Sequence, residues 1–195
     1  LGCESAGEVD AEKHLPSNPV SASVFEAIPQ GKINSESRQL ASQAVLALTE
    51  NRLENASTLI NQALKLNISN AHLQFLNGLI YHRQAVAGDR TKLDLADKGY
   101  ELSIQFDPSN WIPVYHRGLL NLDRRKYREA KKYFSQAAVL NRNEPGIFYN
   151  LAVASYYALD PVTAAGALSR LRSLGHYSEN PKVLRASSMV MAALN

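Results

Sequence analysis

The sequence has little of several things that commit a protein to a particular chemistry. Its 195 residues include one cysteine, which excludes an internal disulfide and a cysteine-rich metal site. The formal net charge is +3, too weak a basic excess to argue for nucleic acid by itself. No window approaches the roughly 20 apolar residues that a transmembrane helix needs. With 45% hydrophobic residues, the chain is still long enough for one sizeable core.

The motifs of catalysis and cofactor binding are also missing from the sequence. We find no glycine-rich phosphate loop, no nucleophile elbow and no spaced pair of acidic residues. The five histidines are not paired with cysteine or carboxylates at the spacing of metal ligands. We therefore expect a protein that is not an enzyme and that has no cofactor and no metal site.

What the sequence does contain is a repeat of 34 residues. Five positions recur at that distance: Gly118, Tyr127, Ala130, Phe134 and Ala137 correspond to Ala152, Pro161, Ala164, Leu168 and Leu171. The same internal spacing holds for Ala44, Leu53, Ala56, Ile60 and Ala63. A further copy begins at Gly78 and carries six extra residues before Leu93, Ala96, Tyr100 and Ser103. A small residue followed twelve positions later by alanine, at this period, is typical of stacked helix-turn-helix units.

The repeat predicts an all-α fold with a defined organisation. We expect an N-terminal flexible tether over residues 1–34 and a repeat domain over 35–195, with Ser35 as the first helix cap. The predicted repeats are 37–70, 71–110, 111–144 and 145–178, and a last amphipathic helix over 181–195 would cap the stack or open a fifth repeat. The extra residues of the second repeat fall within 82–92, as a longer first helix or a longer turn.

Over residues 37–178 the chain resembles the tetratricopeptide repeat (TPR) family, most closely in the copy WIPVYHRGLLNLDRRKYREAKKYFSQAAVLN. The resemblance implies a right-handed superhelical stack of about four repeats. It places Gly118 and Ala130 where the two helices of a repeat approach closely. The departures are the insertion, Asn121 in place of the usual aromatic, and Pro161 in place of tyrosine.

The resemblance also predicts a binding groove. In this family certain positions of the first helix line the concave face of the stack. Carried over to this sequence they give Phe75, Leu79, Tyr115, Leu119, Tyr149, Val153, Tyr156 and Tyr157. Aromatic side chains backed by aliphatic ones would suit an apolar peptide or helix of a partner protein. The alternative is that the tether, or packing within the stack, covers this face. Because no Lys/Asn clamp occupies these positions, we do not expect an adaptor for acidic chaperone tails.

Two other features are candidates for function. Arg124, Arg125, Lys126 and Arg128, followed by Lys131 and Lys132, form a dense basic patch. It is interpreted as a solvated surface, or else as a site for an acidic partner or for anionic lipid headgroups; nucleic acid is not expected. Leu1-Gly2-Cys3 resembles the end of a bacterial lipoprotein signal, which would make Cys3 a lipid anchor. Glu4 then favours the outer membrane by analogy.

Together these features predict a protein-binding scaffold of the bacterial envelope, anchored in the periplasm at the outer membrane. In outline it is similar to the TPR pilotins of type IV pilus and secretion systems, and it would assist assembly of such a complex. Two alternatives stay open. The chain is the N-terminal domain of a longer envelope protein, or it is a cytosolic TPR regulatory or adaptor module.

Overall fold

The computed structural model describes residues 34–175 and residue 192. The predicted tether up to residue 33, Cys3 and all of the predicted cap helix except Ala192 lie outside the described residues. The described part contains helices and turns and no strand. The predicted all-α class is therefore confirmed. None of the helices in residues 34–175 is both long and apolar enough to span a lipid bilayer.

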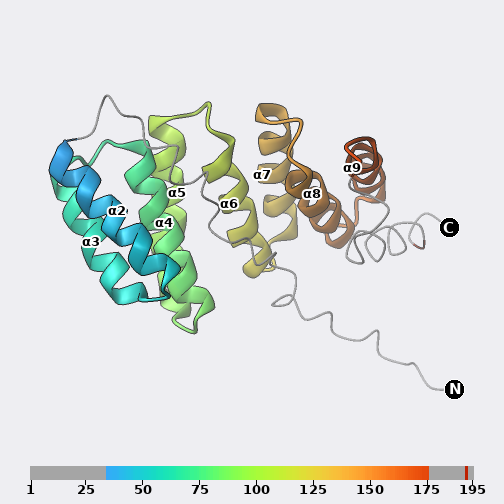
Figure 1. The fold of residues 1–195 in the computed structure, drawn as a ribbon. Helices are drawn as coiled ribbons and strands as arrows, with labels where there is room; N and C mark the ends of the chain where they lie inside the picture. The colour runs from blue at the N-terminus through green and yellow to red at the C-terminus, as the bar shows by residue number, and fades with distance from the viewer. Residues whose placement is uncertain (1–33, 176–191, 193–195) are drawn as a thin grey trace, which may run out of the picture.

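The helices of the described residues follow one another in pairs joined by short turns. The first pair is α2 (Ser35–Thr49) and α3 (Leu53–Leu66), and the second is α4 (Ala71–Val86) and α5 (Leu93–Phe106), with a short 3-10 helix, η2 (Arg90–Lys92), between them. The third pair is α6 (Trp111–Asp123) and α7 (Tyr127–Leu140), and the fourth is α8 (Pro145–Tyr157) and α9 (Pro161–Ser173). Figure 1 shows the pairs stacked side by side, with the turns inside each pair along the lower edge.

Side-chain caps explain where the first helix of each repeat begins. Asn34, Asn70 and Asn110 each accept a hydrogen bond at Oδ1 from a backbone N–H of the first turn. The first cap is therefore Asn34, and the prediction of Ser35 is wrong by one residue. Pro145 and Pro161 each occupy the first helical position, where the missing N–H costs little. This accounts for the departure at Pro161.

Small residues set the distance between the helices of a pair. A methyl group added to Gly118 would lie 2.6 Å from the Phe134 ring. One added to Gly99 would lie 2.6 Å from the backbone nitrogen of Gly78. Neither position has room for a side chain without moving the helices. The repeated glycine and alanine are thus the cause of the close crossing.

The turns inside the pairs share one backbone conformation, a left-handed residue just after the first helix. Asn51, Arg125 and Leu159 occupy the same repeat position, and each has a left-handed φ between 56° and 60°. In the third turn the N–H of Lys126 donates to the carbonyl of Asn121, and the N–H of Arg125 donates to that of Leu122, both at 2.8 Å. This is the Schellman pattern that satisfies the last carbonyls of a helix.

The insertion in the second repeat uses the same conformation one turn later. Here Gly88, with φ of 128°, takes the left-handed position, and the N–H of Asp89 donates to the carbonyl of Gln84. Helix α4 therefore runs three residues beyond the point where the other first helices end, and η2 takes up the other three. The insertion lengthens both the helix and the turn.

The buried apolar residues form two clusters rather than one. The first is built from α2 to α5 with Leu120, and the second is built from α6 to α9. The boundary between them lies where α6 packs on α4 and α5. We call these the N-terminal half and the C-terminal half of the stack.

Candidate functional site

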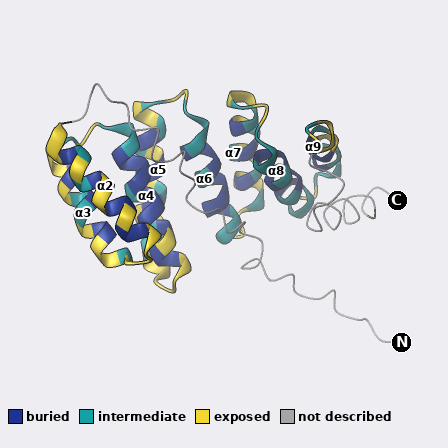
Figure 2. Cartoon of the chain, viewed as in Figure 1, coloured by how far each residue is buried: buried dark blue, intermediate teal, exposed yellow. Residues whose placement is uncertain are grey.

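The predicted groove residues of α8 differ in exposure from those of α4 and α6. The first helices of successive repeats contact one another, so α2, α4, α6 and α8 form one face of the stack. On α4 and α6 the predicted residues are buried: Phe75, Leu79, Tyr115 and Leu119 are 4% to 7% exposed. On α8, Tyr149, Val153, Tyr156 and Tyr157 are partly exposed. Figure 2 shows buried residues along α4, α6 and α8, with intermediate ones between them on α6 and α8.

Ring packing explains why the two predicted aromatics of α4 and α6 are buried. The Phe75 ring lies 5.1 Å from the His116 ring and 6.0 Å from the Tyr100 ring. Tyr115 packs on Phe134, and its hydroxyl accepts a hydrogen bond of 2.8 Å from the amide of Asn150. Both side chains therefore join neighbouring helices. They can support a groove from beneath, but they do not present an open surface to a partner.

Three of the partly exposed predicted residues of α8 lie in one line along the helix. Tyr149, Val153 and Tyr156 are spaced by four and three residues, which places them on the same side of the helix. We call these three residues the α8 stripe. All three pack against the C-terminal core with one side and are partly exposed on the other. Binding at the stripe stays a prediction.

Tyr157 has a different setting from the stripe. Its ring stacks on the ring of Tyr127 at the start of α7, with centroids 4.9 Å apart. This contact joins the third repeat to the fourth near their turns. The Tyr156 ring meets the Tyr157 ring edge-on at 5.3 Å, so the stripe ends at this stacked pair.

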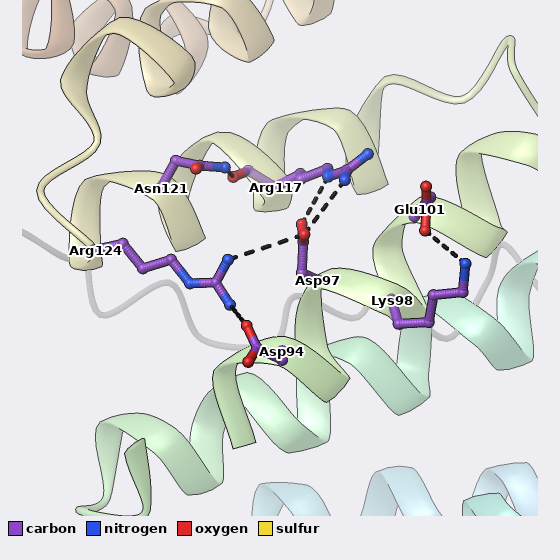
Figure 3. Close-up of polar contacts among 7 residues, drawn as sticks. All are labelled: Asp94, Asp97, Lys98, Glu101, Arg117, Asn121 and Arg124. Carbon is purple, nitrogen blue, oxygen red and sulfur yellow. Dashed lines mark hydrogen bonds and ion pairs between the residues drawn. The ribbon is translucent and has the colours of Figure 1, made fainter. Parts of the chain in front are cut away.

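The predicted basic patch divides into paired and unpaired cations. Arg124 is 14% exposed, with its guanidinium 2.6 Å from Asp94 and 3.9 Å from Asp97 (Figure 3). Lys131 lies 2.8 Å from Asp160, and its hydrogen bond holds the pKa of that carboxyl well below its usual range. For the other cations of the patch, all on the surface, the described residues supply no carboxylate partner. They are Arg125, Lys126, Arg128 and Lys132.

A polar seam joins the two halves, and sequence reasoning missed it. His82 places Nε2 2.7 Å from the Asp123 carboxylate and Nδ1 3.1 Å from the Tyr100 hydroxyl. A ring that donates from Nε2 to the carboxylate accepts the Tyr100 proton at Nδ1, so each group is satisfied. Arg117 donates to Asp97 at 2.7 Å across the same boundary (Figure 3). The signal in the sequence was His82, at a repeat position where the other copies have Leu48, Leu122 and Tyr156.

Two histidines of the stack are held in the uncharged form, His116 beside Tyr100 of the seam and His72 at the start of α4. Burial lowers the pKa of His72 to about 4. Burial also lowers the pKa of His116 to about 3, with further contributions from His82 and Arg83. These shifts have structural causes in aromatic and helical packing. Within residues 34–175 and 192, no group of three His, Cys, Asp or Glu side chains is placed to hold a metal ion.

Comparison with known proteins relates this architecture to solved TPR structures. No family model matches the chain, and no curated protein matches it. Among solved structures, the first TPR domain of Spaghetti (RPAP3), bound to the HSP90 peptide SRMEEVD, is 18% identical, with a TM-score of 0.57 over 63% of this chain and 94% of that one. MamA from Desulfovibrio magneticus RS-1, residues 41 to the end, is 16% identical, with a TM-score of 0.63 over 74% and 78%. The Arabidopsis OM64 TPR domain is 20% identical, with a TM-score of 0.51 over 70% and 94%.

These similarities establish the fold and not the activity. At identities of this size, a shared backbone does not carry over a ligand or a partner. The fold is a stack of TPR helix pairs, as the sequence resemblance predicted. What the surface binds has to be argued from its own side chains.

Proposed function

We propose that this protein is a non-catalytic scaffold that binds an apolar segment of another protein along the α8 stripe. The observation that carries the proposal is the partial exposure of Tyr149, Val153 and Tyr156 in one line on α8. At the positions of Tyr149 and Val153, α4 and α6 bury their counterparts, which are Phe75, Leu79, Tyr115 and Leu119. Tyrosines that combine an apolar ring with a polar tip are frequent anchors of protein interfaces. A peptide or short helix lying along α8 would cover the rings and leave the hydroxyls solvated.

The ligand chemistry proposed here differs from that of one structural neighbour. The TPR domain of Spaghetti was solved with the peptide SRMEEVD, which is acidic. In the present chain the face of the first helices offers aromatic and aliphatic side chains at the predicted groove positions. We therefore expect the stripe to select apolar side chains and to bind with little dependence on salt.

The experiment that tests the stripe uses a photocrosslinking residue in place of single aromatics. With p-benzoylphenylalanine at Tyr156, we expect one dominant crosslinked partner in host cells. The matched control is the same residue at Phe106, which is 41% exposed at the end of α5. The double variant Tyr149→Ala, Tyr156→Ala should abolish capture, because each buried aromatic anchor typically contributes about 2 kcal/mol or more. Equal crosslinking at both sites, or capture that survives the double variant, would contradict the proposal.

We further propose that the scaffold works in the bacterial envelope, in the assembly of a pilus or secretion complex, and that Cys3 carries a lipid. The supports are the Leu1-Gly2-Cys3 motif and the position of the only cysteine ahead of a polar segment. In its host, the protein should then fractionate with the outer membrane, and Cys3→Ala should release it. A Cys3→Ala variant that stays with the membrane would remove the anchor. A wild-type protein found in the cytosol would favour the adaptor alternative.

A further inference from the structure

The four unpaired cations beside the third turn form a second surface, separate from the α8 stripe. Arg125 and Lys126 lie in the turn, and Arg128 and Lys132 lie one turn apart on α7. We call these four residues the basic turn surface. Helix α7 begins at this surface without a side-chain cap, so the positive end of its dipole adds to the four charges.

The described part of the chain has little negative charge left to neutralise this surface. Within residues 34–175, every Asp and Glu except Glu36 and Glu129 is engaged by a hydrogen bond or an ion pair. The engaged ones are Glu50, Glu54, Asp89, Asp94, Asp97, Glu101, Asp107, Asp123, Glu144 and Asp160. Within the patch, Asp94 and Asp160 are paired with Arg124 and Lys131, and Glu129 beside Arg128 supplies one negative charge against the four positive ones. The surface therefore keeps a net positive charge that a further acidic group can complement.

The same chain carries such acidic groups in its first residues. Glu4, Glu8, Asp10 and Glu12 lie close together and are followed by a single lysine, Lys13. We propose that this acidic segment, residues 4–12, docks on the basic turn surface. The surface is thereby occupied by its own chain until a more acidic partner displaces the segment. The proposal is independent of the α8 stripe, and its test uses protein whose Cys3 is not lipidated.

The length of the intervening chain permits the contact. From Glu12 to Asn34 there are 22 residues, which span at most about 75 Å. The path from the start of α2 to the third turn crosses two helix spacings of about 10 Å and one helix length of about 20 Å. A tether of matching length gives an effective concentration in the millimolar range, so even a weak ionic contact is occupied.

The test uses the single cysteine of the chain. A nitroxide on Cys3 broadens the amide resonances of residues close to it, so the 15N-labelled full chain reports where the segment lies. We expect broadening at residues 124–132 and not at the turn of the first repeat around Asn51. Raising the salt from about 0.05 M to about 0.5 M should remove most of it, because exposed charges are screened.

Charge reversal decides whether the contact is specific. The variant Arg125→Glu, Lys126→Glu, Arg128→Glu should reduce the broadening several-fold, and adding Glu8→Lys, Asp10→Lys, Glu12→Lys should restore it. The matched control reverses three cations elsewhere on the surface: Lys65→Glu, Lys98→Glu, Arg142→Glu. Recovery in the swapped variant also shows that the reversed chain folds.

Three results would overturn the proposal. Broadening spread evenly over the stack would mean that the segment does not dock. Broadening that the first charge reversal leaves unchanged would place the segment on a different surface. Loss of binding to phosphatidylglycerol vesicles in that variant, with no local broadening in the wild type, would assign the basic turn surface to lipid. None of these results depends on the crosslinking partner of Tyr156.

Discussion

The two halves of the stack have the same backbone and different surfaces. In the N-terminal half, α4 buries Phe75 and Leu79 and the first helix α2 buries Ala41 and Val45. In the C-terminal half, α8 leaves Tyr149 and Tyr156 partly exposed. The two largest exposures of apolar side chains also lie there, at Leu159 with 87% and Val162 with 77%. The comparison teaches that repetition of the helix pairs fixes the fold, whereas the surface that we propose for binding lies only on α8, where Tyr149 and Tyr156 stay partly exposed.

The largest effect should come from breaking the seam between the halves. Asp123→Ala leaves the buried Nε2–H of His82 without its acceptor, and an unsatisfied buried donor costs about 1–3 kcal/mol, toward the upper end where the lost partner is charged. We expect urea unfolding followed by the fluorescence of Trp111, in α6, to separate from unfolding followed by circular dichroism.

The control for the seam is Asp94→Ala, which removes a carboxylate that is 96% exposed. A surface pair of this kind contributes up to about 1 kcal/mol, so its two transitions should stay coincident. If Asp123→Ala unfolds at the wild-type urea midpoint, the polar contacts do not hold the halves together.

The next largest effect should be a loss of stability in acid. The pKa of His72 is about 4 and that of His116 about 3 in the folded chain, both below the usual value of 6.5. Below pH 6.5 these histidines therefore bind protons in the unfolded chain while they stay unprotonated in the folded chain. The free energy of unfolding falls as the pH drops toward 4. At pH 5 each histidine should lower the free energy of unfolding by up to about 2 kcal/mol.

The measurement is the urea midpoint at pH 7 and at pH 5, for the wild type and for His116→Phe. Phenylalanine keeps a ring beside Phe75 and Tyr100 but cannot bind a proton. The variant should lose part of the pH dependence. An unchanged dependence would mean that His116 is not the titrating group.

Packing within the pairs should respond alike in both halves. Ala56 and Ala130 occupy the same repeat position, and both are fully buried. Ala56→Leu and Ala130→Leu should each destabilise the stack by about 1–3 kcal/mol, because overpacking pushes the paired helices apart. A neutral effect of either substitution on the melting temperature would show that the repeat register is wrong there.

The smallest expected effect is a gain in stability when glycine replaces the left-handed residue of a turn, and it should differ between the two halves. Leu159 adopts a left-handed φ of 60° with its side chain in solvent, so Leu159→Gly should stabilise the protein by about 1 kcal/mol. Asn51 has nearly the same φ, but asparagine tolerates it, and Asn51→Gly should gain less. Thermal unfolding of both variants checks the order. A destabilised Leu159→Gly would mean that the leucine makes a contact that outweighs its strain.

The fold could be predicted from the sequence because its cause is local and repeated. Gly118 and Ala130 admit only a close helix pair, and the same pattern recurs every 34 residues. The division of the six-residue insertion between α4 and η2 was left open, since Gly88 can end a helix wherever its left-handed φ is needed.

The site was harder to predict because exposure depends on distant residues. Phe75 and Tyr149 hold the same repeat position, yet Phe75 is buried with His116 packed against its ring, while Tyr149 is partly exposed. The seam was missed for the same reason, since His82 and Asp123 are 41 positions apart in the chain. Periodicity reports which face a residue is on, and not what the neighbouring repeat places there.

The longer first helix of the second repeat makes the turn between α4 and α5 project beyond the turns of the other helix pairs. Because α4 continues for three extra residues, its turn is displaced by about 4.5 Å along the helix axis. Arg90 of η2 holds this projection against the next repeat by donating to the Asp123 carbonyl at 3.0 Å. Identical repeats would let a long ligand slide by one unit and find equivalent contacts. The projection removes that ambiguity, so an elongated ligand on this edge has a single alignment.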